Sequence, residues 1–241
     1  MKAVILAAGI GNRLKPLTDK MPKSLIKIGD RTVLERMLDS LVDLGITDVT
    51  IVVGHLKHMI MDLAGKDYRT AGCKYITNPD YELGSILSLY AARDEFAGED
   101  VLLMDADVIF ENKVLAKVID STNANCFLVD KNLKDAAQGE EMKVASLGGR
   151  VVQIARKVTR EYDSIGEGVG FCKISSACSK ELLKSLEKRI CLNRLCDYEM
   201  ALDDFCQRVS AGVEDVTGLK WTEIDFPEDV EKARAIAGGL L

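Results

Sequence analysis

Acidic residues stand at the ends of two predicted strands. Asp105 and Asp107 close an apolar run that starts at residue 101, and Asp225 ends a short predicted strand over 222–225. Carboxylate oxygens suit a hard cation such as Mg²⁺, which proteins hold through one or two carboxylates together with substrate phosphates. Because α/β sheets bind ligands at the carboxyl ends of their strands, we expect a metal and phosphate site here. A helix cap or a solvated strand end would explain either group alone.

A turn with two glycines follows the first predicted strand directly. It reads Leu6-Ala7-Ala8-Gly9-Ile10-Gly11-Asn12-Arg13-Leu14. Small residues let backbone N–H groups approach a bulky anion, so the turn is a candidate phosphate cradle. It lacks the third glycine of the dinucleotide-binding turn, and it is not a Walker A loop. A plain connector is the alternative interpretation.

Basic residues continue the chain beyond this turn. Pro16 and Pro22 restrict the backbone of the segment, so Arg13 and Lys23 could face the same side. They would offer a guanidinium fork and a point charge to a triphosphate. A solvated basic loop is the alternative.

These residues resemble the signature of nucleotidylyltransferases that act on sugar phosphates and related alcohol phosphates. The shared pattern G-x-G-x-R-L-x-P-L-T-x-x-x-P-K-x-L runs here from Gly9 to Leu25. The resemblance implies that Arg13 stabilises the transferring α-phosphate and that Lys23 binds the acceptor phosphate and the α-phosphate. It also implies a nucleotide site that includes Leu6, Ala8, Gly9 and Gly11. Asn12 departs from the pattern, because many members have Thr or Ser there.

The resemblance also assigns the carboxylates. In relatives, one Asp of a D-x-D element and one Asp late in the chain hold Mg²⁺ jointly, and these positions match Asp107 and Asp225. The acceptor phosphate oxygen would attack the α-phosphate in line while pyrophosphate leaves, without a covalent enzyme intermediate. Asp105 is expected at the nucleotide ribose or at a metal-bound water.

The segment 78–89 is the candidate base-recognition element. Gly84 and Ser85 open a predicted helix, so free N–H groups and a hydroxyl could read a base edge, although a simple N-cap is the alternative. The segment resembles the N-P-x-Y…S-L stretch of cytidylyltransferases that activate phosphocholine, aminoethylphosphonate and similar small acceptors. This resemblance implies CTP as the nucleotide and places Asn78, Gly84 and Ser85 at its binding site.

The acceptor, a small phosphorylated or phosphonate compound, is expected to bind the middle region of the chain. Choline-type relatives often carry an aromatic residue before the Tyr-Glu pair, where this chain has Asp197. That departure leaves room for a primary amine, an amino-acid amide phosphate or a polyol phosphate. Lys143 and Lys157 could bind the acceptor phosphate or could lie on a solvated strand face. The candidate acceptor residues are Lys143, Lys157, Glu167, Tyr198, Glu199 and Trp221.

Alternating strands and helices must position these residues. Strands predicted at Lys2–Ala7, Asp48–Val53, 74–77 and Val101–Asp105 alternate with helices predicted at 32–44, 55–63, 85–96 and Asn112–Ile119. One helix between successive strands indicates parallel βαβ units. The expected fold is α/β, with a Rossmann-like, mostly parallel mixed sheet flanked by helices.

The pattern changes after residue 123. Two strand-like runs, 142–147 and 150–158, are joined by Gly148-Gly149, which favours a hairpin and hence a small antiparallel β insertion. A strand over 168–174, helices over 177–191 and 198–209, and a helix over 227–236 are also expected. We expect one domain over 1–241, with a nucleotide-binding half at 1–122. The half at 123–241 would bind the acceptor and supply the last metal ligand.

Composition excludes several other classes of protein. Hydrophobic residues make up 47% and charged residues 29%, so the chain is not intrinsically disordered. The net charge is -6 and the basic residues are scattered, which does not favour nucleic acid. Apolar runs fall short of the roughly 18 residues of a membrane span, and no signal peptide is evident, so a cytoplasmic protein without membrane insertion is expected. Seven cysteines without a C-x-x-C pair favour buried thiols.

Two alternative functions stay open at this point. A sugar-1-phosphate nucleotidylyltransferase using dTTP, UTP or GTP would share the fold and the chemistry. A non-catalytic nucleotide-binding regulatory module would share only the fold, and Arg13, Lys23, Asp107 and Asp225 together argue against it. Members of the family are often dimers, so a homodimer is possible.

Overall fold

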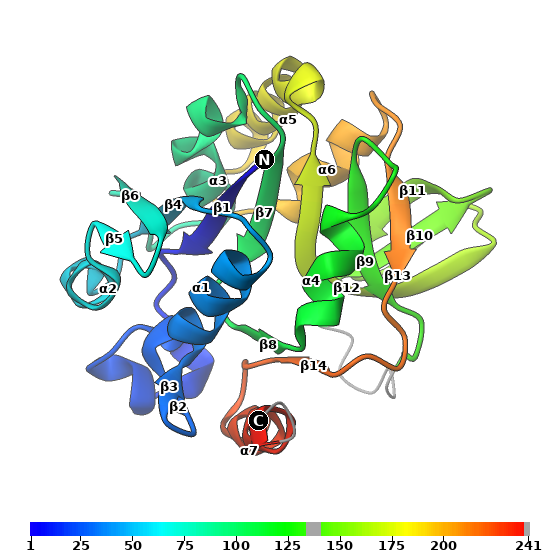
Figure 1. Ribbon diagram of the computed structural model, residues 1–241. Coiled ribbons are helices and arrows are strands. Elements are labelled where there is room, and N and C mark those ends of the chain that lie inside the picture. The colour runs from blue at the N-terminus through cyan, green and yellow to red at the C-terminus, as the bar shows by residue number, and fades with distance from the viewer. Residues whose placement is uncertain (134–140, 239–241) are drawn as a thin grey trace.

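The computed structural model describes residues 1–133 and 141–238. Within them, ten strands form one sheet with helices on both of its faces (Figure 1). The strands are β1 (Lys2–Ala7), β4 (Asp48–Val53), β5 (Asp67–Tyr68), β6 (Ala71–Thr77), β7 (Val101–Asp105), β9 (Cys126–Asp130), β10 (Lys143–Leu147), β11 (Arg150–Ala155), β12 (Ser164–Ile174) and β13 (Gly212–Asp215). Their order is β10-β11-β13-β9-β12-β7-β1-β4-β6-β5.

The first half of the chain forms the parallel part of the sheet. β1 lies between β7 and β4, and β6 follows β4, all in parallel register. β1 and β7 are almost wholly apolar because both of their faces are covered by helices. The crossover helices are α1 (Val33–Asp43), α2 (Lys57–Ala64), α3 (Ile86–Ala91) and α4 (Asn112–Ile119). The predicted βαβ units are therefore confirmed.

Helix α1 begins at the predicted capping box. The Thr32 hydroxyl accepts a hydrogen bond from the Glu35 amide at 3.1 Å, and the Glu35 carboxylate accepts one from the Thr32 amide at 2.7 Å. This satisfies backbone N–H groups that have no partner within the helix. Leu34, Met37 and Leu41 then fall on one face and are fully buried against the sheet.

The second half of the chain extends the same sheet in mainly antiparallel register. The predicted hairpin exists, and Gly148 and Gly149 have φ values of 58° and 77° at its turn. It is joined to the main sheet, because β10 pairs with β11 on one side and with β12 on the other. β12 is antiparallel to both β7 and β9, whereas β13 runs parallel to β9. β13 was not predicted, since it offers few apolar residues and depends on its pairing with β9.

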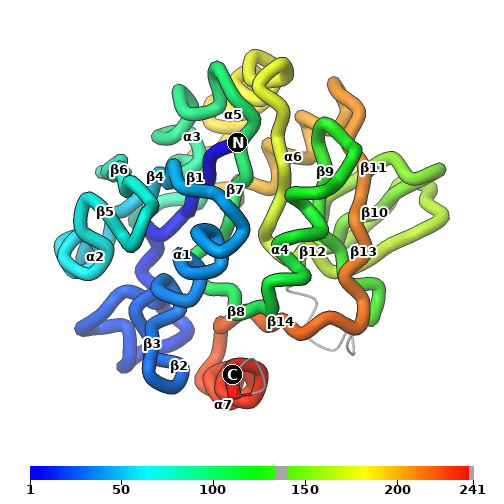
Figure 2. The backbone as a smooth tube through the Cα atoms, viewed as in Figure 1, coloured from blue at the N-terminus to red at the C-terminus, as the bar shows by residue number. Residues whose placement is uncertain are grey.

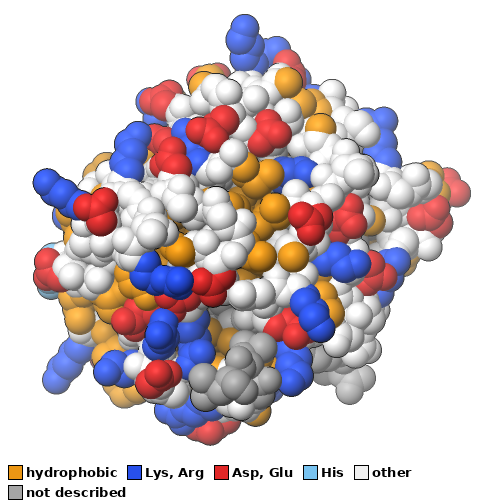
Figure 3. Space-filling model, viewed as in Figure 1, with side chains coloured by type: hydrophobic (Ala, Val, Ile, Leu, Met, Phe, Trp, Pro, Cys, Tyr) orange, Lys and Arg blue, Asp and Glu red, His pale blue; other side chains and the backbone are white. Residues whose placement is uncertain are grey.

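The helices cover the sheet in two layers. α1, α2 and α4 pack on one face, and α3 packs on the other with α5 (Ser179–Leu192) and α6 (Glu199–Cys206). Cys126 and Cys172 are buried in β9 and β12, as the apolar surroundings predict. Figure 3 shows Lys and Arg interspersed with Asp and Glu over one face of the molecule.

A third apolar cluster fixes the C-terminal segment beneath the sheet. β8 (Val108–Phe110) pairs antiparallel with β14 (Trp221–Glu223), and α7 (Pro227–Gly238) lies below them (Figure 2). Val230 and Ala233 of α7 pack with Leu14, Ile28 and other residues that follow the glycine turn. Short strands β2 (Lys27–Ile28) and β3 (Arg31–Thr32) complete this region. Helix α7 is thus packed against the loop that carries the predicted phosphate ligands.

None of the helices in the described part of the chain is long and apolar enough to cross a bilayer.

Candidate active site

A cleft of about 830 Å³ opens at the carboxyl ends of β1 and β7. Its wall combines the glycine turn, the start of α3, the residues after β7, the start of α6 and the segment around β14. The predicted site residues that line it are Leu6, Ala8, Gly9, Gly11, Arg13, Lys23, Ser85, Asp105, Asp107, Glu167, Tyr198, Glu199, Trp221 and Asp225. Those that do not line it are Asn78, Gly84, Lys143 and Lys157.

The glycine turn forms one rim of the cleft. Gly11 has a φ of 71°, a left-handed conformation that glycine adopts without strain. The Thr18 hydroxyl donates a hydrogen bond to the Gly11 carbonyl at 2.8 Å, which fixes the turn. A Cβ atom at Gly11 would lie 3.0 Å from the Thr18 side chain. The backbone can therefore fold back here only because Gly11 has no side chain.

Lys23 joins two carboxylates from distant parts of the sequence. Its Nζ lies 2.6 Å from Asp107 Oδ2 and 2.6 Å from Asp225 Oδ1. Arg13 contacts the other oxygen of Asp225 at 2.9 Å. The pairing of β8 with β14 brings the aspartates together, because the Ile224 amide donates to the Asp107 carbonyl at 3.0 Å.

The charges in this cluster are strongly coupled. Burial alone would lower the pKa of Lys23, but the negative charges of Asp107 and Asp225 outweigh it and raise that pKa. Glu223 keeps contact with solvent, yet the protein atoms crowded around its carboxyl and the charges of Asp107 and Asp225 raise its pKa to about 8. A cation in this cluster would relieve the repulsion among the three acids.

The acids of the cluster fit a divalent metal ion. One carboxylate oxygen each from Asp107, Glu223 and Asp225 lies within 4.8 Å of the others. Asp107 Oδ1 is buried and has no hydrogen-bond partner among the described residues. An all-oxygen donor set with one unsatisfied oxygen suits Mg²⁺. Glu223 was not predicted, because its place beside Asp107 depends on the β8–β14 pairing rather than on local sequence.

The start of α3 differs from its predicted role. The Gly84 amide donates to the Arg194 carbonyl at 3.1 Å, so it is not free to read a base edge. Asn78 is buried, and its side-chain amide supports the Ser88 hydroxyl at 3.0 Å. Both residues therefore stand behind the wall of the cleft. The side chains that reach the cleft from this region include Ser85 and Ser88.

The side of the cleft predicted to bind the acceptor is built on the start of α6. The Tyr198 amide donates to the Ser85 hydroxyl at 3.0 Å, and its phenol donates to Asp105 Oδ2 at 2.7 Å. Burial, together with the charges of Asp107 and Glu199, raises the pKa of Asp105 well above its ordinary range. Burial likewise raises the pKa of Glu199 to about 7. This side of the cleft is therefore a crowded acidic surface.

Two predicted lysines lie outside this surface. Lys143 donates to the Arg156 carbonyl at 3.3 Å, and Lys157 is exposed. Arg156, the residue after β11, lines the cleft instead and pairs with Asp197 at 2.8 Å. Both residues follow β11 in a bend of the chain, and of the two only Arg156 lines the cleft.

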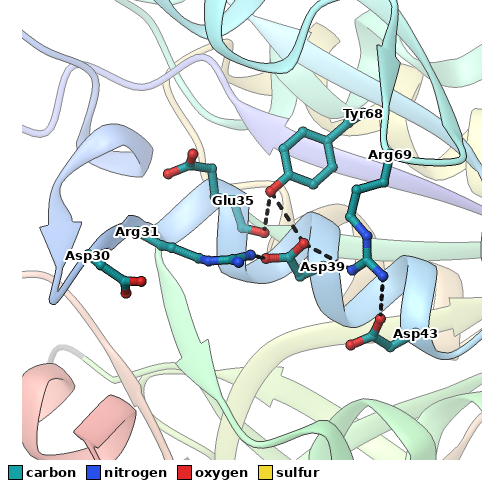
Figure 4. Close-up of a pocket in the computed structure, with 7 residues that line it drawn as sticks. All are labelled: Asp30, Arg31, Glu35, Asp39, Asp43, Tyr68 and Arg69. Atoms are coloured by element: carbon teal, nitrogen blue, oxygen red, sulfur yellow. Dashed lines mark hydrogen bonds and ion pairs between the residues drawn. The ribbon is translucent and has the colours of Figure 1, made fainter. Parts of the chain in front are cut away.

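A second hollow, of about 760 Å³, lies between α1 and the segment that carries Tyr68 and Arg69 (Figure 4). Arg69 contacts Asp39 and Asp43 at 3.0 Å each, and Arg31 also pairs with Asp39. The Tyr68 hydroxyl lies 3.3 Å from Asp39, and burial raises the pKa of Tyr68 to about 12. These contacts tie β5 to α1.

An α/β sheet that places such a cluster beside a glycine turn is characteristic of nucleotidyltransferases. Within that class, the chain belongs to the family described as the MobA-like NTP transferase domain, whose family model matches residues 3–163. The resemblance found in the sequence is thereby confirmed, and the chain is an enzyme of this class.

Individual relatives cover nearly all of the chain. It is 28% identical to a CMP-5'-(3-aminopropyl)phosphonate synthase of Streptomyces rubellomurinus over 97% of its length, but it spans only 38% of that protein. It is also 28% identical to a choline-phosphate cytidylyltransferase of Streptococcus pneumoniae, with 98% of both chains covered. The solved structure of a CTP:phosphocholine cytidylyltransferase from Streptococcus pneumoniae has a TM-score of 0.75 at 24% identity and covers 98% of both chains. This last likeness shows the shared fold.

Proposed function

We infer that the enzyme transfers CMP from CTP to a small alcohol phosphate or phosphonate and releases pyrophosphate. The observation that carries this proposal is the convergence of Arg13, Lys23, Asp107 and Asp225 in one cleft beside the glycine turn. These residues come from three distant parts of the chain, and a phosphate-transfer site requires them together.

Asp107 and Asp225, together with Glu223, would hold Mg²⁺ through the oxygens described above. When bound, this ion would supply positive charge to the α-phosphate and to the departing pyrophosphate. No covalent bond to the protein is needed, because the acceptor oxygen displaces pyrophosphate directly.

The basic residues then act on the phosphates. Lys23 is held between two carboxylates, and its ammonium can turn from them to the α-phosphate and the acceptor phosphate once those charges arrive. Arg13 has a side chain that is 49% exposed, so it can rearrange to bind the developing charge at the α-phosphate. The backbone of the glycine turn leaves room for the triphosphate.

CTP is favoured over other nucleotides by the names of the relatives. Two of them are named for CMP or cytidylyl transfer, and their named acceptors are an aminopropylphosphonate and a choline phosphate. Ser85 and Ser88 line the cleft with hydroxyls that suit the polar edge of a base. A sugar-1-phosphate nucleotidylyltransferase that uses dTTP, UTP or GTP is the second candidate.

Pyrophosphate release tests both candidates directly. The enzyme is incubated with Mg²⁺, one of CTP, UTP, dTTP, GTP or ATP, and one acceptor. The acceptors are phosphocholine, phosphoethanolamine, 2-aminoethylphosphonate, a polyol phosphate and glucose-1-phosphate. We expect release with CTP and a small acceptor, and loss of release when EDTA is added.

Other outcomes would contradict the proposal. Release with glucose-1-phosphate and a different nucleotide would assign the enzyme to sugar activation. The absence of pyrophosphate release with every pair of nucleotide and acceptor would contradict transfer to any of these acceptors. The Lys23→Met variant is the matched loss-of-function control, because it keeps a long side chain but removes the cation.

A further inference from the structure

One carboxylate oxygen on the acceptor side has no partner. Glu199 Oε2 is buried and makes no hydrogen bond to any described residue. A buried acceptor oxygen without a donor is costly, and such groups at a binding site are commonly satisfied by a ligand. Glu199 lines the cleft at the start of α6. Its unsatisfied oxygen therefore marks a place for a donor that the substrate brings.

Neighbouring acids already have partners of their own. Asp105 accepts the hydrogen bond of the Tyr198 phenol at 2.7 Å, and Asp197 pairs with Arg156 at 2.8 Å. Asp107 and Asp225 hold Lys23. On the acceptor side, Glu199 is thus the acid whose buried oxygen is left without a donor among the described residues.

The aromatic residues on this side do not form an open cage. Tyr198 and Trp221 expose only 5% and 6% of their surface. The Trp221 indole N–H is bound to Asp130 at 2.9 Å, and the Tyr198 phenol is bound to Asp105. A quaternary ammonium group carries no N–H and relies on aromatic faces for its binding. It could not satisfy Glu199 Oε2, and the rings of Tyr198 and Trp221 offer it little accessible surface.

We propose that Glu199 binds a primary ammonium group of the acceptor, so that the acceptor is an aminoalkyl phosphate or aminoalkyl phosphonate. An ammonium supplies both the missing donor and a positive charge beside the buried carboxylate oxygen. A neutral hydroxyl would supply only the donor. The inference rests on the proposed nucleotidyl transfer and names its acceptor class and a residue that selects it.

A series of acceptors with one changed group tests this assignment. 2-Aminoethylphosphonate is compared with propylphosphonate, in which a methyl group replaces the ammonium, and with 2-hydroxyethylphosphonate and phosphocholine. With CTP and Mg²⁺, we expect kcat/KM for the primary amine to exceed that for each of the others by about 10²-fold. Equal or better use of propylphosphonate or phosphocholine would overturn the proposal.

The Glu199→Gln variant tests the residue itself. It keeps the shape of the side chain and removes its charge, so the preference for the amine over propylphosphonate should fall to within about 3-fold. Circular dichroism and the thermal midpoint check that the variant folds. Glu187→Gln, the same change at an exposed position of α5, should leave the preference unchanged. A preference for the amine that survives in Glu199→Gln would refute the role of Glu199.

A binding measurement separates this inference from the proposed function. Titration calorimetry of 2-aminoethylphosphonate and propylphosphonate into the protein with CTP and Ca²⁺ requires no turnover. Tighter binding of the amine to wild type than to Glu199→Gln would support the subsite even if the panel showed no pyrophosphate release. Turnover without any amine preference would instead leave the transferase function standing and remove the subsite.

Discussion

Asp107 and Asp225 both contact the ammonium group of Lys23 and, by our proposal, both bind one metal ion. Replacing either by Asn keeps the side-chain size but removes a charge that Lys23 and Mg²⁺ both require. We expect kcat/KM to fall by about 10³-fold or more in Asp107→Asn and in Asp225→Asn. Pyrophosphate release measures the loss, and circular dichroism checks the fold. Asp62→Asn, on an exposed position of α2, is the control, and near-normal activity in either site variant would remove the metal assignment.

The raised pKa of Glu199 predicts how stability depends on pH. Burial and the charges of Asp197 and Asp107 raise this pKa from 4.5 to about 7, although Arg156 opposes the shift. Between these values the folded chain binds more protons at Glu199 than the unfolded chain, so this residue lowers the stability as the pH rises from about 4.5 to 7. Glu199→Gln removes that contribution.

Urea unfolding of the substrate-free protein at pH 5 and pH 8 measures the effect. We expect the free energy of unfolding of Glu199→Gln, relative to wild type, to be higher at pH 8 than at pH 5 by about 1–3 kcal/mol. A difference that does not change with pH would contradict the raised pKa.

Some of the site residues were predictable because their role is local. Arg13 and Lys23 lie in one short segment whose glycines and prolines already indicate a phosphate loop. The packing of Gly84, which was predicted to bind the nucleotide, and the position of Glu223 were not predictable, since the first depends on the segment 194–196 and the second on a strand pairing. The surroundings of each residue are set by residues more than one hundred positions away in the sequence, so no local sequence pattern predicts them.

The helix start at Gly84 depends on a close contact between two segments. A Cβ atom at this position would lie 2.3 Å from the Cys196 carbonyl oxygen, and backbone atoms cannot yield easily. We expect Gly84→Ala to lower the free energy of unfolding by about 1–3 kcal/mol and to raise KM for the acceptor, because the start of α6 must shift. Urea unfolding and steady-state kinetics measure the two effects.

The control for this variant is Gly72→Ala. Gly72 lies in β6, and a Cβ atom there would meet nothing within 4 Å. We expect its stability to stay within about 0.5 kcal/mol of wild type. Equal effects of the two substitutions would show that the contact with residues 194–196 does not cause the loss of stability in Gly84→Ala.

Strands with strong apolar patterns were predictable, whereas strands defined by their neighbours were not. β1, β4 and β7 have the predicted bounds because buried parallel strands read as continuous apolar runs. β8 has only three residues, and β13 has a single strongly apolar one, so each depends on a partner strand from elsewhere in the chain. The hairpin at 148–149 could be predicted because its turn depends on two consecutive glycines, which is a local feature of the sequence.

The molecule as a whole is closed by contacts between its two ends. α7 packs on the residues that follow the glycine turn, and Asp225 stands two residues before its first residue. The α/β class and the mixed sheet with flanking helices were predicted correctly. The packing of α7 could not be predicted, since it depends on which apolar residues the N-terminal loop leaves uncovered. A homodimer stays a prediction.

Substrate binding should therefore stabilise the entire fold. At 100 times its dissociation constant, a ligand adds about 2.7 kcal/mol, which corresponds to a rise in Tm of about 5–10 °C for a chain of this size. We expect CTP with Mg²⁺ to produce such a rise in a thermal shift assay. Asp225→Asn should lose the part that requires Mg²⁺, and an undiminished Mg²⁺-dependent rise in this variant would contradict the metal site.

The hydrogen bond that joins the start of α3 to the start of α6 couples the two sides of the cleft. Ser85 lines the cleft where we propose that the nucleotide binds, and its hydroxyl accepts a hydrogen bond from the amide of Tyr198, which precedes Glu199. A nucleotide that orders Ser85 thus also orders the acceptor side, so the two substrates should bind cooperatively. Thermodynamic reciprocity then requires that CTP tightens acceptor binding by the same factor by which the acceptor tightens CTP binding. Calorimetric titrations in both orders would measure that factor, and Ser85→Ala should bring it close to one.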